Sequence, residues 1–191
     1  MKLKIAVVQF KVRKVSDEEN LKKAELFIKK VASLKSNIIV FPEDFITRML
    51  TEERESIRSY YYVKLFKKLA KRYKIDIVPG SIIEREGSYL YNTSYYINSI
   101  GRVLAKYRKV HLWASEKKKM KSGHNVSVFK TKYGKIALII CWDLMFPDLF
   151  KRMNLRGAEI VICPSFWCKG DAGKGIKYDS KSEKNLLTLC A

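Results

Sequence analysis

Residues that form metal sites and disulfides are scarce in this sequence. The 191 residues include two His and four Cys, namely Cys141, Cys163, Cys168 and Cys190. No two of these Cys have the C-x-x-C spacing of zinc and redox motifs, and two His add few candidate zinc ligands. We therefore expect no metal site.

Long apolar segments are also missing. No run approaches the roughly 20 residues that cross a membrane. The N-terminal stretch MKLKIAVVQF has neither the hydrophobic region nor the cleavage site of a signal peptide. Together with the Cys pattern, which is typical of a reducing compartment, this predicts a cytoplasmic protein that does not associate with membranes.

Acidic residues are outnumbered by basic residues. The chain has 19 Asp and Glu against 39 Lys and Arg, which gives a formal net charge of +20. Such an excess attracts nucleic acid non-specifically, so a nucleic-acid-binding protein is one hypothesis. The Lys residues are spread along the chain, however, and no nucleic-acid motif accompanies them.

The apolar residues that are present predict a single α/β domain over residues 1–191. Hydrophobic residues make up 47% of the chain, which is ordinary for a globular domain. The predicted strands are 3–9, 37–41, 75–83 with a break at Pro79-Gly80, 88–98, 101–113, 126–131, 135–140 and 158–167. Turn signals make hairpins of 88–113 and 126–140. Strands alternating with helices and mixed with hairpins indicate a mixed sheet.

Helix signals lie between these strands. Ser16 and Glu19 form a capping box at the start of one helix, and 56–73 has the apolar spacing of a second. Pro147 suits the first turn of a third helix, and Gly157 its C-terminal end. The tail from Asp179 also has a helical pattern.

Three reactive side chains directly follow apolar runs: Glu43, Lys109 and Cys141. Side chains at strand ends converge on pockets in α/β sheets. A carboxylate can take the proton of a thiol, the thiolate can attack a carbon, and an ammonium can stabilise the oxyanion. A helix start and a nearby cation lower the pKa of a thiol, which would favour this chemistry at Cys141. The alternative is two solvated charges and a Cys in the core.

Several blocks of the sequence resemble the nitrilase superfamily of carbon–nitrogen hydrolases. They are IAVVQF, IIVFPE, YNTSYYI, GRVLAKYRKVHLW, ICWDLMFPD and RGAEIVICPSFW, in the order in which the family has them. Three blocks carry the family's catalytic positions, which match here as Glu43, Lys109 and Cys141. The resemblance implies an α-β-β-α sandwich and pairing of subunits into a homo-oligomer.

The resemblance also implies a mechanism and a substrate class. Glu43 is the general base for Cys141, which attacks an amide, carbamoyl or nitrile carbon and forms a thioester. Lys109 and the backbone N–H of Trp142 hold the oxyanion, and water then releases an acid. No cofactor is implied. Which small-molecule substrate is used is not readable from these blocks.

Further residues are site candidates with ordinary alternatives. Glu116 matches a second Glu that family members often carry after the Lys, but it also adjoins a run of Lys as a surface acid would. Trp113, Trp142 and Trp167 line a substrate pocket or belong to the core. We expect Asp143 to fix the turn after Cys141.

The C-terminal end departs from the family pattern. The chain stops at LLTLCA, where the family continues into further strands, so the resemblance implies a sandwich that is short at its C-terminus. A non-catalytic homologue that acts as a subunit of an assembly is therefore a second hypothesis beside the active hydrolase.

Overall fold

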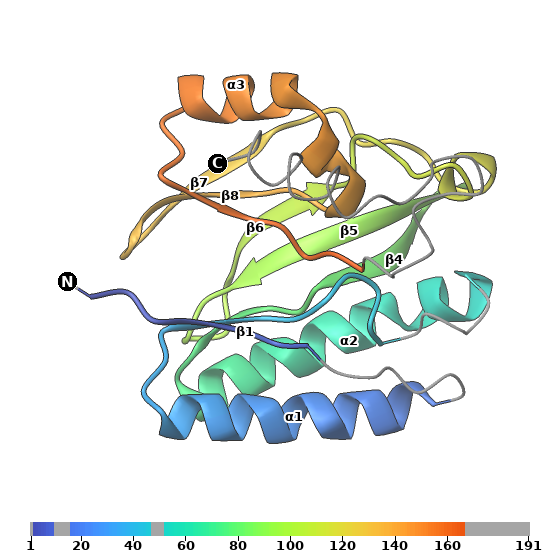
Figure 1. Cartoon of the computed structure of the whole chain (residues 1–191). Helices are drawn as coiled ribbons and strands as arrows, with labels where there is room; N and C mark the ends of the chain where they lie inside the picture. Colours follow the sequence, from blue (N-terminus) through green and yellow to red (C-terminus); the bar gives the residue numbers. More distant parts are fainter. Residues whose placement is uncertain (1, 10–15, 47–51, 167–191) are drawn as a thin grey trace, which may run out of the picture.

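The computed structural model describes residues 2–9, 16–46 and 52–166, and only the backbone of 52–55. Two β-sheets lie face to face, with helices on the outer side of each, so that the layers run α-β-β-α (Figure 1). This confirms the predicted sandwich with mixed sheets. Trp167, Cys168, Cys190 and the predicted tail helix from Asp179 lie outside the described residues.

The first sheet combines parallel and antiparallel pairs. Its strands are β1 (Ile5–Val7), β2 (Ile38–Val40), β3 (Asp76–Val78), β4 (Ser81–Glu86), β5 (Tyr89–Ile97) and β6 (Val103–Arg108). The first three are parallel, whereas β5 runs antiparallel to β3, β4 and β6. The predicted break at Pro79-Gly80 is confirmed, because it separates β3 from β4 while both pair with β5.

The second sheet contains β7 (Ser127–Thr131), β8 (Gly134–Leu138) and β9 (Ile160–Ile162). The pair β7–β8 is the predicted hairpin, and β9 is parallel to β8. We expected β9 to span 158–167, but it is shorter. After Ile162 the backbone turns toward β8, and the carbonyl of Pro164 accepts a hydrogen bond from the N–H of Cys141.

Within the described residues, the α-helices that cover the sheets are α1 (Asp17–Ser33), α2 (Glu52–Tyr73) and α3 (Pro147–Leu155). The Ser16 side chain accepts a hydrogen bond from the N–H of Glu19, as the capping box predicts. Pro147 and Gly157 also take their predicted places, since α3 begins at Pro147 and Gly157 follows its end with a φ of 76°. Helix α2 begins at Glu52, one turn before the predicted start near Ser56. The sequence pattern did not predict this first turn because it is polar and shows no apolar periodicity.

The core lies in two layers. Ile39 and Ile77 pack toward α1 and α2, whereas Ile38, Val40 and Val78 pack between the sheets. Strands β2 and β3 are thus buried on both faces, which explains why β2 is continuously apolar and why Asp76 is the one polar residue in β3. No helix among the described residues is long and apolar enough to cross a membrane.

The break after β3 also positions the next strand end. Gly80 has a φ of 68°, and a Cβ at this position would lie 1.8 Å from the carbonyl oxygen of Pro42. Only glycine permits this approach. The contact fixes the backbone immediately before Glu43.

Candidate active site

The three strand-end residues come together at one place between the sheets. Glu43 follows β2, Lys109 follows β6 and Cys141 follows β8. Glu43 and Lys109 are 6% and 2% exposed, and Cys141 is half-buried beside them. The alternative of scattered, solvated charges is therefore wrong.

Lys109 lies at the centre of this cluster. Its Nζ is 2.8 Å from Oε1 of Glu43 and 2.8 Å from Oε2 of Glu116. Burial alone would lower the pKa of Lys109, but the two carboxylates outweigh it and raise that pKa. Lys109 is therefore charged at neutral pH.

Glu116 belongs to the cluster and does not point away as a surface acid. It stands at the start of the short 3₁₀-helix η1 (Glu116–Lys118). Besides Lys109, its carboxylate accepts hydrogen bonds from the N–H of Trp113 at 2.6 Å and from Nδ2 of Asn92 at 2.8 Å. These bonds hold the carboxylate toward the interior.

Glu43 is held by three donors. Oε1 accepts from Lys109 and from Nδ2 of Asn92, at 2.8 and 3.1 Å. Oε2 accepts from the N–H of Phe166 at 3.2 Å. Three fixed donors leave the carboxylate little freedom to rotate.

Cys141 starts the 3₁₀-helix η2 (Cys141–Met145) with a φ of 45°. Such a backbone is unfavourable for a residue with a Cβ and is found often at functional sites. The N–H of Cys141 donates to the carbonyl of Pro164 at 3.0 Å, which ties this turn to the segment after β9.

The thiol itself differs from the sequence-based expectation. Burial and the nearby Glu43 carboxylate raise the pKa of Cys141, and Lys109 lowers it only in part. The expected lowering by a helix start and a cation is therefore wrong, because burial and the Glu43 carboxylate outweigh the effect of Lys109. The resting pair is a thiol beside a carboxylate.

Asp143 fixes the turn, as expected. It is fully buried and accepts hydrogen bonds from the N–H of Ile140 at 3.0 Å, the hydroxyl of Tyr107 at 2.7 Å and the N–H of His111 at 2.7 Å. These bonds join the strand end before Cys141 to the segment after Lys109. Asp143 therefore sets the distance between the two reactive groups.

The described tryptophans lie beside the cluster. The rings of Trp113 and Trp142 meet edge to face with centroids 4.4 Å apart, and both residues are half-buried. Trp113 is linked to Glu116 through its backbone. Both remain candidates for the wall of a substrate pocket.

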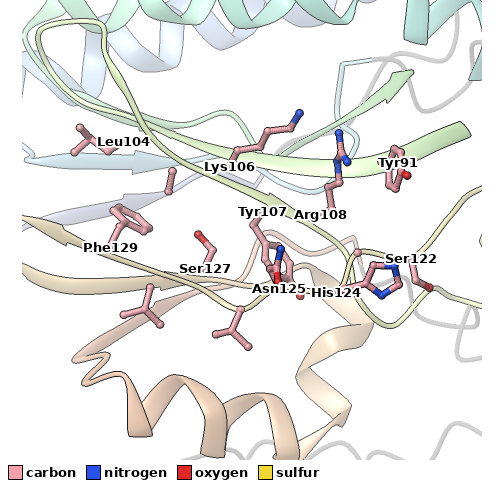
Figure 2. Close-up of a pocket in the computed structure, with 14 residues that line it drawn as sticks. Tyr91, Leu104, Lys106, Tyr107, Arg108, Ser122, His124, Asn125, Ser127 and Phe129 are labelled. Atoms are coloured by element: carbon pink, nitrogen blue, oxygen red, sulfur yellow. The ribbon is translucent and has the colours of Figure 1, made fainter. Parts of the chain in front are cut away.

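A separate groove lies between β6 and the segment that leads into β7. It has a volume of about 640 Å³, and Lys106, Arg108, His124 and Phe129 are among the residues that line it (Figure 2). Glu43, Lys109, Glu116 and Cys141 are not among its lining residues. The groove is therefore distinct from the cluster.

Asn92 was not predicted as a site residue, although it bridges Glu43 and Glu116. The available signal was a polar side chain inside a strand as buried as β5, because buried polar groups need partners.

Within the described part of the chain, no group of three or more His, Cys, Asp or Glu is arranged to hold a metal ion.

Known proteins resemble most of this chain. The family model for carbon-nitrogen hydrolases matches residues 4–176. A citrullinase of Francisella tularensis is 34% identical over 194 residues, covering 94% of this chain, and a 2-oxoglutaramate amidase of Bacillus subtilis is 30% identical over 177 residues, covering 87%. The chain spans 66% of the length of each of these relatives.

Solved structures show the same fold. The crystal structure of a carbon-nitrogen hydrolase from Helicobacter pylori G27 matches with a TM-score of 0.84 at 21% identity, covering 98% of this chain and 68% of that one. The match of the family model over most of the sequence, together with this fold, shows that the chain belongs to the carbon–nitrogen hydrolase family of the nitrilase superfamily.

Proposed function

We propose that the chain carries the catalytic machinery of a hydrolase that cleaves non-peptide carbon–nitrogen bonds through Cys141. The observation that supports this most directly is the convergence of Glu43 and Glu116 on the ammonium of Lys109, beside a half-buried thiol. A base, a cation and a nucleophile within one buried cluster are the parts that acyl transfer needs.

The reaction begins from the neutral thiol. Because the pKa of Cys141 is raised, the proton leaves Sγ for Glu43 as sulfur attacks the carbon of the substrate. Lys109 and the N–H of Trp142 stabilise the oxyanion. General-base catalysis typically contributes about 10²–10⁴ in rate, and loss of one oxyanion donor costs about 10²–10³.

The second half restores the enzyme. The protonated Glu43 gives its proton to the leaving nitrogen, so that ammonia or an amine departs and a thioester remains on Cys141. Glu43 then takes a proton from water, whose oxygen attacks the thioester. The products are a carboxylic acid and the thiol, and atoms and charge balance over the cycle.

Small primary amides and ureido compounds are the first substrates to test. The names of two relatives, 2-oxoglutaramate amidase and citrullinase, indicate these two classes of substrate. The test is ammonia release from a panel of amides, N-carbamoyl compounds and nitriles, with intact-protein mass spectrometry to detect an acyl adduct. Cys141→Ala should abolish both signals, whereas Cys163→Ala should retain them.

The control replaces a second half-buried thiol, whose Sγ lies 4.0 Å from the carbonyl oxygen of Cys141. Turnover by the Cys141→Ala variant would overturn the proposal. A folded wild-type protein with no turnover across the panel would favour the non-catalytic subunit instead.

We also propose that the subunits pair into a homo-oligomer, as the family resemblance implies. Light scattering, recorded as the protein elutes from a size-exclusion column, measures its mass directly. A mass of 22.3 kDa, which is that of one chain, at all concentrations tested would contradict pairing.

A further inference from the structure

Asn92 contacts Glu43, Glu116 and Lys109, although it was not predicted as a site residue. It lies in the middle of β5 and is 2% exposed. Its Nδ2 donates to Glu43 at 3.1 Å and to Glu116 at 2.8 Å. Its backbone carbonyl accepts the N–H of Lys109 at 2.9 Å.

The identity of the amide atoms follows from these partners. Ionised carboxylates only accept hydrogen bonds, so the nitrogen of Asn92 must face them, and its two N–H groups allow one bond to each. A carboxylate at this position would repel both acids, and an apolar side chain would leave them short of donors. An amide is suited to stand between two negative charges.

The other end of the side chain argues against a purely structural role. Oδ1 of Asn92 is buried and has no hydrogen-bond partner among the described residues. An unpaired buried carbonyl is unfavourable for folding. The amide is therefore oriented to serve the two carboxylates and leaves its own oxygen unpaired.

We propose that Asn92 is a positioning residue, which holds the ionised carboxylates of Glu43 and Glu116 apart around Lys109 and aims Glu43 at Cys141. This role rests on the proposed function of the same site. Asn92 itself does not exchange protons with the substrate, because an amide does not titrate.

The test compares Asn92→Leu with the wild type and with Thr93→Val. Leucine has the same branched shape and the same number of side-chain heavy atoms as asparagine, although its methyl groups are larger, and it lacks both donors. Thr93 is the neighbouring residue of β5 and fully buried, and its hydroxyl has no partner within the described part of the chain. The valine variant therefore controls for any change in the packing of this strand.

We expect Asn92→Leu to lower kcat about 10- to 100-fold, which is less than loss of a general base costs, with KM changed less than threefold. Thr93→Val should leave kcat and KM within about twofold of the wild type. A kcat for Asn92→Leu within twofold of the wild type would overturn the proposal.

A second measurement requires no substrate. Asn92 donates hydrogen bonds to two carboxylates of the cluster, and their loss leaves buried acceptors without a donor, whereas the hydroxyl of Thr93 has no partner to lose among the described residues. At pH 7.5 Asn92→Leu should therefore lower Tm by more than Thr93→Val does. Equal losses of Tm in the two variants would indicate a packing role alone and contradict the proposal.

Asn92→Asp provides an independent variant if the leucine protein does not fold. At pH 7.5 it places a third carboxylate beside one ammonium, so we expect a greater loss of kcat than in Asn92→Leu. Activity should recover in part at lower pH, where a protonated carboxyl donates one hydrogen bond. A profile parallel to that of the wild type would refute the role of Asn92. Absence of wild-type turnover would refute the proposed function, while the Tm comparison still decides the role of Asn92.

Discussion

Oε1 of Glu43 lies 2.8 Å from Nζ of Lys109, although the two residues are 66 positions apart in the sequence. Both side chains are almost completely buried. A buried ion pair is stable only when each charge keeps its partners, so this contact couples the chemistry of the site to the stability of the fold.

Removal of the shared cation should therefore affect both properties. Lys109→Ala leaves Glu43 and Glu116 buried without their counter-ion, which should destabilise the protein by about 3–5 kcal/mol and reduce kcat/KM at least 10²-fold. Denaturant unfolding and ammonia release measure the two effects.

Lys106→Ala is the matched control for this change. Nζ of Lys106 forms a contact of similar length with Glu84, 2.7 Å, but its side chain is 43% exposed. Its loss should cost no more than about 1 kcal/mol and leave kcat/KM unchanged. Equal losses of stability in the two variants would show that burial does not decide the value of the Lys109 contacts.

The two carboxylates around Lys109 should differ in importance. Glu43→Gln removes the proposed base and should reduce kcat about 10²–10⁴-fold. Glu116→Gln keeps an oxygen that can accept the hydrogen bond from the N–H of Trp113, so we expect kcat to fall only about 10- to 100-fold. This loss arises because Lys109 keeps one carboxylate partner instead of two. Steady-state kinetics of both variants on one substrate checks the order, and a larger loss for Glu116→Gln would reverse the assignment.

The reactivity of Cys141 toward iodoacetamide should rise with pH without a plateau near neutrality. Burial and Glu43 raise its pKa above the ordinary value of a thiol, and an acid with a raised pKa keeps its proton to higher pH. The thiolate fraction, and with it the alkylation rate, should still be increasing between pH 7 and 9.5. Peptide mapping after timed alkylation measures this rate.

Cys163 is an internal comparison for that measurement. Burial raises the pKa of Cys163 to about 11, so its alkylation should also increase over the same interval. A rate for Cys141 that levels off below pH 7.5 would show a thiolate formed before the substrate binds, and the proton transfer to Glu43 would then not belong to the reaction.

The sequence and the structure agree best where the signal is local. Glu43, Lys109 and Cys141 each follow a strand. Strands β2 and β6 belong to one sheet and β8 to the other, so packing of the two sheets brings the three strand ends together. The start of α2 at Glu52 was missed because its first turn has no apolar residue to reveal the helical period. Packing of the later turns, not the pattern of the first, continues the helix back to that point.

Properties that depend on several partners were beyond the sequence. The pKa of Cys141 is the sum of burial, one carboxylate and one cation, and the sequence shows neither their distances nor that Lys109 serves two acids. Asn92 stands within a strand instead of at its end, so only the folded position reveals that it faces Glu43. The site was therefore predictable as a set of residues, but its charge balance was not.

The close approach of β3–β4 to the segment before Glu43 gives a last prediction. Gly80→Ala places a methyl group on the carbonyl of Pro42 and should both destabilise the fold, by about 3 kcal/mol or more, and displace Glu43. Gly87→Ala is its control, because Gly87 also has a positive φ, 57°, but nothing lies within 4 Å of the added Cβ.

The two variants share the cost of a left-handed backbone, which is about 1–2 kcal/mol for a residue with a Cβ. Any further loss of stability in Gly80→Ala therefore measures the clash with Pro42. We expect kcat to fall only in Gly80→Ala, since Gly87 lies in the exposed turn between β4 and β5 and a Cβ there meets nothing within 4 Å. Equal stability and equal kcat in the two variants would show that Pro42 moves aside without disturbing Glu43, and the contact would then not position the site.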